Sequence, residues 1–324
     1  MKFTLFSLKI LTVVLTAIGF FYVTPAYCEQ QFTIGFSQAT TTEPWRLLFN
    51  DLLRKEARKH KEINLLMRNA QDDVSMQIGH IEEFIQRRVD AILVSPKVSK
   101  AMTPIINQAF NNGIPTIILD RGLDNDRYTQ FIGGDNFFIG QEAGRFAVKH
   151  LGGEGKAKGN IVEIWGGMAS TPARDRHNGF FQVVSKEPGI KIVGKLKDGD
   201  WKQDKGYLIM SQFLVDHPQI DLVYAHNDPM AYGAYLAAKD VKRENKIAFI
   251  GIDGIPAEGV RWVDQGFLDA TFLYMTPGAE GIRQVLRLLK GNPVPKHVIL
   301  PSMMIDKTNS HEILKQHGLL DTSG

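Results

Sequence analysis

The chain has 324 residues, of which 44% are hydrophobic, 23% charged and 10% aromatic. This composition is typical of a globular protein long enough to form two domains, and it excludes disordered, collagen-like and solenoid chains. The formal net charge of +3 gives no electrostatic basis for binding nucleic acid.

The first 28 residues predict a secretory signal peptide. Two lysines precede an apolar run over residues 10–23, and Ala26 and Cys28 supply the small residues that a signal peptidase needs. The run is shorter than the roughly 18 apolar residues that span a bilayer. We therefore expect cleavage after Cys28 and export. The alternative, a lipid anchor on Cys28, is disfavoured because Tyr27 stands where a lipoprotein signal usually has a small residue.

After this segment, short β-branched runs alternate with amphipathic stretches. The first series predicts strand 32–38, helix 45–60, strand 63–70, helix 74–85, strand 90–96, helix 103–112 and strand 114–120. Such alternation implies right-handed crossovers between parallel strands, with helices covering both faces of the sheet.

A second series of the same kind follows Asp135. It predicts helix 137–151, strand 160–165, helix 172–186, strand 190–197, helix 204–216, strand 222–226, helix 230–241 and strand 246–252. Strands are also expected over 268–274 and 298–305, and either could return the chain to the first series. The sequence therefore predicts an α/β fold of two doubly wound parallel-sheet lobes, with a seam near residue 134.

Ligands of open parallel sheets bind beyond the carboxyl ends of the strands. The residues there are mostly carboxylates, amides, arginines and indoles. Besides the ten site candidates named below, they include Gln38, Glu43, Ser95, Asp135, Asp200 and Asp228. Charged groups bond strongly to hydroxyls, and an indole covers the apolar face of a sugar. No nucleophile has an evident base. We therefore expect a site for a neutral polyol, built from Ser37, Trp45, Asp120, Arg121, Asn136, Arg174, Arg176, Trp201, Asn227 and Asp253.

Two pairs of neighbouring candidates need a division of roles. Arg174 and Arg176 lie two residues apart, so on a helix only one reaches a common ligand, and we favour Arg176. Arg174 then pairs with Asp175 or lines the rim. Asn227 and Asp228 both precede a helix, and we assign Asn227 to the ligand and Asp228 to the N-cap.

The four tryptophans divide by sequence context. Trp45 and Trp201 have polar neighbours and are expected in the cleft, although large aromatic residues usually lie in the core. Trp165 on a strand and Trp262 on a helix face are expected to pack in the core or on the surface. The nine histidines lack the spacing of metal ligands, so no metal and no other cofactor is expected.

Several motifs resemble those of periplasmic sugar-binding proteins of the ribose-binding type, over residues 32–305. They are Asp120-Arg121, 171–180, 224–230 and 251–254, in the family's order. Within this family, the galactofuranose-binding branch is the most similar in sequence, over segments 35–38, 45–46, 199–206 and 224–228.

This resemblance implies a type I periplasmic binding protein fold whose two lobes are joined by a three-strand hinge and close on the ligand. The N-terminal lobe would comprise 29–134 and 276–302, and the C-terminal lobe 135–275 and 303–324. Segment 270–277 is one residue longer than the family's hinge pattern, so the resemblance does not assign the ligand-facing residue there.

The resemblance also implies a role for each site residue. Asp120 and Arg121 would bind hydroxyls from the first lobe. The second lobe would contribute Arg176, Asn227 and Asp253, while Trp45 and Trp201 would sandwich the sugar ring.

Three functions follow from these observations. The first is capture of a monosaccharide and its delivery, as a monomer, to the membrane permease of an ABC transporter. The second is a periplasmic sensory receptor that presents its bound form to a histidine kinase or chemoreceptor. The third, a hydrolase using Asp120 with Asp253, is disfavoured because a nearby arginine would hold each carboxylate ionised. A DNA-binding repressor is excluded because an export signal occupies the place of its helix-turn-helix.

Overall fold

A computed structural model describes residues 31–320 and contains two separate parallel sheets. The predicted signal peptide, including Cys28, lies outside the described residues. Six parallel strands form the first sheet, in the order β12-β5-β4-β3-β1-β2. They are β1 (Phe32–Gln38), β2 (Ile63–Asn69), β3 (Ala91–Ser95), β4 (Thr116–Leu119), β5 (Gln130–Gly134) and β12 (His297–Leu300).

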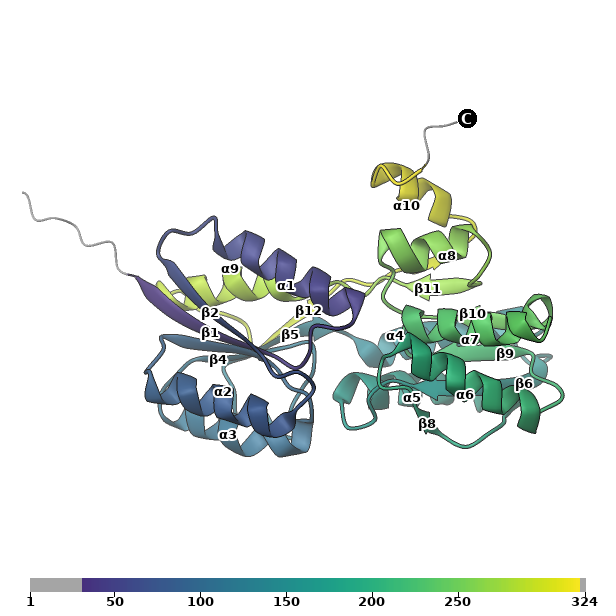
Figure 1. Cartoon of the computed structure of the whole chain (residues 1–324), viewed down its shortest axis with the longest axis horizontal. Helices are drawn as coiled ribbons and strands as arrows, with labels where there is room; N and C mark the ends of the chain where they lie inside the picture. Colours follow the sequence, from purple (N-terminus) through teal and green to yellow (C-terminus); the bar gives the residue numbers. More distant parts are fainter. Residues whose placement is uncertain (1–30, 321–324) are drawn as a thin grey trace, which may run out of the picture. The chain divides into compact units, whose positions relative to one another are not determined.

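Helices cover both faces of this first sheet (Figure 1). One face carries α1 (Pro44–Ala57) against α9 (Gly278–Leu289), and the other carries α2 (Val74–Gln86) against α3 (Ser99–Asn111). All five residues of β3 are buried, as expected of a parallel strand covered on both faces.

The second sheet has the order β13-β11-β10-β9-β6-β7, with β8 also paired to β6. Only β13 runs antiparallel to its neighbour. The strands are β6 (Lys158–Trp165), β7 (Gly189–Ile192), β8 (Lys197–Asp198), β9 (Leu222–Ala225), β10 (Ala248–Ile250), β11 (Ala270–Phe272) and β13 (Met304–Asp306).

Two helix pairs pack on the second sheet, α4 with α5 and α6 with α7. Among the helices of residues 31–320, none is both long and apolar enough to cross a bilayer. The helical elements of this part are α4 (Asn136–His150), α5 (Thr171–Val184), α6 (Gln203–Asp216), α7 (Asp228–Asp240), a 3₁₀ turn (Glu244–Lys246), a π-helical turn (Pro256–Val260), α8 (Arg261–Asp264) and α10 (Ser310–Gln316).

Three polar side chains cap helices that begin beside the carboxyl ends of strands. Asp73 accepts a hydrogen bond from the Met76 N–H at the start of α2, and Asp135 accepts one from Phe138 at the start of α4. Asn227 caps α7 in the same way. Each cap satisfies a backbone donor that the helix leaves free, so these residues fix where the helices start.

The two doubly wound parallel sheets confirm the predicted fold class. The chain passes from one sheet to the other after β5, after β11 and after β12. The predicted segment 298–305 therefore contains two strands, β12 and β13, that belong to different sheets. The lobe boundaries and the bending at these three crossings remain predictions.

Some elements differ from the prediction. The strand predicted over 190–197 is split into β7 and β8, because Gly194 adopts a φ of 85° between them. Helix α3 starts at Ser99 rather than at residue 103 and contains Pro104. The carbonyl left free by this proline belongs to Lys100, an exposed residue that water can reach. Strand β5 and helix α9 have no counterpart among the predicted elements.

Candidate functional site

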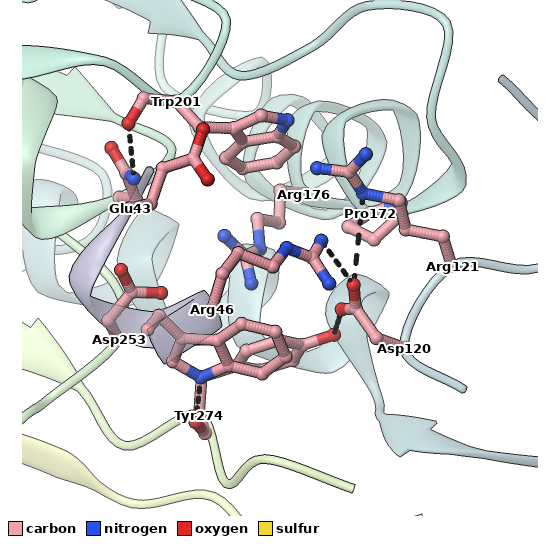
Figure 2. Close-up of a pocket in the computed structure, with 11 residues that line it drawn as sticks. Glu43, Arg46, Asp120, Arg121, Pro172, Arg176, Trp201, Asp253 and Tyr274 are labelled. Carbon is pink, nitrogen blue, oxygen red and sulfur yellow. Dashed lines mark hydrogen bonds and ion pairs between the residues drawn. The ribbon is translucent and has the colours of Figure 1, made fainter. Parts of the chain in front are cut away.

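A pocket of about 360 Å³, including its mouth, lies where the carboxyl ends of both sheets meet (Figure 2). Eleven residues line it, namely Glu43, Trp45, Arg46, Asp120, Arg121, Pro172, Arg176, Trp201, Asn227, Asp253 and Tyr274. The strand-end rule therefore located the site, and it brought together Trp45, Asp120, Arg121, Arg176, Trp201, Asn227 and Asp253.

Three predicted site residues do not line this pocket. The Ser37 hydroxyl lies 3.1 Å from His80 Nδ1 on α2. Arg174 is exposed, and its guanidinium faces Asp124 at 3.8 Å rather than Asp175. Asn136 does not line the pocket itself but supports a residue that does, since it accepts a 2.9 Å hydrogen bond from Arg176 Nε.

Asp120 is the centre of the first lobe's side of the pocket. It follows β4 with a left-handed φ of 67° and is only 3% exposed, so it does not form the surface ion pair that the dipeptide Asp120-Arg121 alone would suggest. Its Oδ2 accepts a 2.7 Å hydrogen bond from Arg46 Nη2, and its Oδ1 accepts one of 2.8 Å from the Tyr274 hydroxyl. Burial by itself raises the pKa of Asp120, but Arg46, Arg121 and Tyr274 outweigh it and hold the pKa below its usual value.

Arg46 was not among the predicted site residues. Besides Asp120, its guanidinium donates to Ser95 Oγ at 2.9 Å and to Gln38 Oε1 at 3.2 Å. It also lies over the indole of Trp45, 4.9 Å from the ring centroid. These contacts buttress the Asp120 carboxylate and cover one side of Trp45.

Arg176 is the buried cation of the second lobe. It extends from α5, whose close packing on α4 depends on Gly140, since a side-chain carbon there would collide with the Arg176 backbone carbonyl. Its Nε donates to Asn136 and its Nη1 donates to the His226 backbone carbonyl. Its guanidinium lies 4.5 Å from the Tyr274 ring centroid and 5.4 Å from that of Trp201. The preference for Arg176 over Arg174 as the residue in the pocket agrees with this geometry.

The expectation that Asp228 caps α7 is wrong. Asn227 is itself the N-cap, because its Oδ1 accepts from the Met230 N–H at 3.1 Å, and its Nδ2 donates to the Trp201 carbonyl at 3.0 Å. Asp228 instead accepts from the Thr271 hydroxyl at 2.6 Å and from the Gly254 N–H at 2.8 Å. It thus ties strand β11 to the segment that follows β10, while Asn227 both caps α7 and faces the pocket.

Asp253 is a second buried carboxyl on the pocket wall. Burial raises its pKa well above the usual value, nearby Asp228 and Glu258 raise it further, and Arg176 and Arg46 only partly oppose this. Burial also raises the pKa of Asp228 to about 7. The expectation that an arginine holds Asp253 ionised is therefore wrong. Of these two pocket carboxyls, Asp120 favours its ionised form and Asp253 favours its neutral form.

Both predicted cleft tryptophans line the pocket. Trp45 donates from Nε1 to the Tyr274 carbonyl at 2.7 Å. Trp201 packs flat against Gly166, where any side chain would collide with the indole, and Arg121 lies 5.6 Å from its centroid. Trp165 is buried in the core, and Trp262 stacks on Tyr232, as predicted.

Three buried polar atoms of the pocket residues have no hydrogen-bond partner within the described part of the chain: Glu43 Oε2, Arg121 Nε and Trp201 Nε1. Buried polar groups are normally paired, so one acceptor and two donors are available to a ligand. Burial lowers the pKa of Arg121 to about 10, which leaves it charged at neutral pH. The sequence offered no decisive signal for Glu43, Pro172 or Tyr274.

Known proteins share this fold. A family described as "Periplasmic binding protein domain" matches residues 34–293. The galactofuranose-binding protein YtfQ of Escherichia coli (strain K12) is 32% identical over 232 residues, which cover 69% of this chain and 71% of that protein.

Two solved structures superpose closely on this chain. The fructose binding periplasmic domain of the hybrid two component system BT1754 has 38% sequence identity and a TM-score of 0.85, covering 89% of this chain and 95% of its own. A Mycobacterium smegmatis structure in complex with β-D-fucofuranose has 31% identity and a TM-score of 0.81, covering 89% of this chain and 96% of its own.

Proposed function

Because the chain belongs to the periplasmic binding protein family, we propose that it captures a monosaccharide in its furanose ring form and delivers it to an ABC transporter. The observation that carries this proposal is the pocket, where buried arginines, carboxyls and two indoles meet from both lobes. Two relatives support the ring form, since their names specify galactofuranose and fucofuranose.

The charge and chemistry of the pocket residues suggest how each would contact a sugar. Ionised Asp120 accepts hydrogen bonds from sugar hydroxyls, while Arg121 and Arg176 donate to sugar oxygens. A neutral Asp253 both donates and accepts. Trp201 covers the apolar face of the ring. A sugar that lacks or inverts a hydroxyl leaves one of these groups unpaired, at a cost of about 1–3 kcal/mol each.

We propose that capture proceeds by closure of the two lobes, with boundaries at 29–134 plus 276–302 and 135–275 plus 303–324. The three chain crossings near residues 134, 276 and 302 would act as the hinge. The signal peptide over residues 1–28 would export the protein, which would work as a monomer.

Binding without catalysis is the proposed outcome. Glycoside hydrolysis needs one protonated and one free carboxyl, and Asp253 with Asp120 meets the protonation requirement. However, Arg46 and Tyr274 hold Asp120 as a fixed hydrogen-bond acceptor, which is the role that sugar binding requires of it. The named relatives are binding proteins. Release of reducing sugar from a panel of glycosides would overturn this assignment.

A sensory role is the second candidate, favoured by the similarity to the periplasmic domain of a hybrid two component system. The two roles make opposite predictions for a strain that lacks this protein. Loss of uptake of radiolabelled sugar supports transport. Normal uptake with loss of sugar-induced transcription supports sensing.

The sugar-binding proposal is tested by a thermal-shift panel of D-fructose, D-galactose, L-arabinose, D-ribose and myo-inositol on the mature protein. A ligand at 100 times its Kd adds about 2.7 kcal/mol to the free energy of unfolding, which raises the midpoint by several degrees. Arg176→Ala should abolish the shift while retaining the circular dichroism spectrum. An unchanged shift in this variant would contradict the site, and no shift with any sugar in the wild type would contradict the function.

A further inference from the structure

Five charged residues form one ion-pair network between the two lobes, which we call the latch. Asp72 and Lys97 come from the first lobe, and Asp200, Lys202 and Lys205 from the second. Each carboxylate binds lysines from both lobes. The Nζ–Oδ distances are Lys97–Asp72 2.7 Å, Lys97–Asp200 3.0 Å, Lys202–Asp72 2.8 Å, Lys202–Asp200 2.8 Å and Lys205–Asp200 3.0 Å.

The latch lies next to the pocket but does not line it. Asp72 precedes α2 and Lys97 precedes α3, so both follow carboxyl ends of strands in the first sheet. Asp200 directly precedes Trp201, whose indole does line the pocket. The latch therefore contacts the ligand site through the backbone of Trp201 rather than through the ligand.

The backbone at the latch is held in an unusual conformation. Asp72, Asp200 and Trp201 have φ values of 68°, 46° and 67°. This left-handed region is unfavourable for side chains, most of all for a bulky one, and is kept only where surrounding contacts determine it. The ion pairs of Asp200, together with the Asn227 hydrogen bond to the Trp201 carbonyl, supply those contacts.

The electrostatics of the latch favour a network over isolated surface pairs. The side chains of Lys97 and Asp200 are only 17% and 19% exposed. Burial raises the pKa of Asp200, but the lysines outweigh it and lower the pKa far below its usual value. A single exposed ion pair contributes little to stability, whereas two carboxylates shared among three ammonium groups form a connected, half-buried array.

We propose that the latch holds the lobes closed and that Asp200 is a positioning residue, which keeps Trp201 over the bound ligand. The ligand part of this inference rests on the proposed sugar-binding function, whereas lobe closure does not. Because the charges are partly exposed, salt weakens the latch and opens the cleft. Ligand release thereby becomes dependent on ionic strength.

Neutral substitutions test the latch through ligand kinetics. We expect Lys97→Gln and Asp200→Asn each to raise the dissociation rate of D-fructose about tenfold and to flatten its dependence on NaCl. The double variant should be little worse than either single one, because both remove the same interaction. Lys55→Gln is the matched control, since it breaks an exposed pair with Asp51 within the first lobe. Release rates and salt dependence equal to those of the control would overturn the proposal.

Small-angle X-ray scattering of the ligand-free protein tests closure independently of any sugar. The radius of gyration should be larger for Lys97→Gln than for the wild type in 20 mM NaCl, and the two should converge in 1 M NaCl. Identical radii at both salt concentrations would overturn the latch. If the wild type binds no sugar, the proposed function fails, and this measurement still decides whether the latch closes the lobes.

Discussion

The Tyr274 hydroxyl donates a 2.8 Å hydrogen bond to Asp120 Oδ1, and so joins a chain crossing between the sheets to the carboxylate at the end of β4. The same hydroxyl accepts from Asn136 Nδ2 at 3.1 Å, and the ring lies beneath the Arg176 guanidinium. Tyr274 therefore contacts polar groups of both lobes from the segment that connects them. Any bending at this crossing must move the ligand-binding groups together.

Tyr274→Phe should weaken sugar binding by about tenfold. The ring and its contacts stay, but Asp120 loses one donor and Asn136 loses one of its two acceptors. A hydrogen bond to a charged group is worth about 1.5–3 kcal/mol. Isothermal titration calorimetry measures the change. Tyr232→Phe, which removes a hydroxyl from α7 away from the pocket, is the control. Equal affinities for the two variants would show that the hydroxyl has no role in the site.

The two pocket carboxyls should respond differently to the same substitution. Asp120→Asn removes a charge that Arg46 needs, and breaking a buried pair costs about 3–5 kcal/mol of unfolding free energy. Asp253→Asn replaces a group that favours its neutral form with a neutral amide of the same shape. The protein should therefore stay folded, and its affinity for the sugar should change by less than about tenfold. Chemical denaturation and calorimetry on both variants check this. Greater damage from Asp253→Asn would contradict the assigned charge states.

Asp228 should make stability fall as pH rises. Its pKa is raised to about 7 in the folded protein from an ordinary value of 3.8, so between these values the folded state binds the proton that the unfolded state has lost. The stabilisation is complete below about pH 4 and lost as pH approaches 7. The thermal midpoint of the wild type minus that of Asp228→Asn should decrease from pH 5 to pH 8. Buried His226 is common to both proteins, whereas Asp253 changes with the variant because Asp228 also raises its pKa, and this contribution acts in the same direction. A constant difference would refute the raised pKa.

Gly140→Ala should destabilise the second lobe and displace Arg176. A methyl group there collides with the Arg176 backbone carbonyl where α4 meets α5, and such overpacking costs about 1–3 kcal/mol. Gly79→Ala on α2 is a matched control, because nothing lies within 4 Å of its new methyl group. Helix propensity predicts that this control gains up to about 1 kcal/mol. Denaturant unfolding of both variants measures the difference, and equal stabilities would disprove the close packing.

The fold was predictable because parallel strands read as continuous apolar runs separated by amphipathic helices. The rule that ligands bind at strand ends then predicted most of the residues that line the pocket. Strand β5 was missed because its Phe-Ile-Gly-Gly ending lacks a sustained β-branched run. Ser37 also follows the strand-end rule but does not line this pocket, because its hydroxyl lies against His80 on α2.

Pocket residues that lie on a helix or on a crossing between the sheets were harder to predict than those at strand ends. Arg46 reaches Asp120 only because α1 starts at Pro44 and turns its first residues toward β4. Tyr274 lies beyond the end of β11, where the chain crosses between the sheets, and no local pattern shows which residue faces the pocket there. Such contacts depend on how distant segments pack, which periodicity and spacing do not specify.

The central claim, capture of a five-membered sugar ring, is tested most directly by calorimetric titration with 2,5-anhydro-D-mannitol and 1,5-anhydro-D-mannitol. These isomers carry the same atoms in rings of five and six members, and neither can change its ring size in solution. The account predicts that the five-membered ring binds at least tenfold more tightly, and that Arg176→Ala loses this binding. Equal affinity for both isomers, or tighter binding of the six-membered ring, would contradict it.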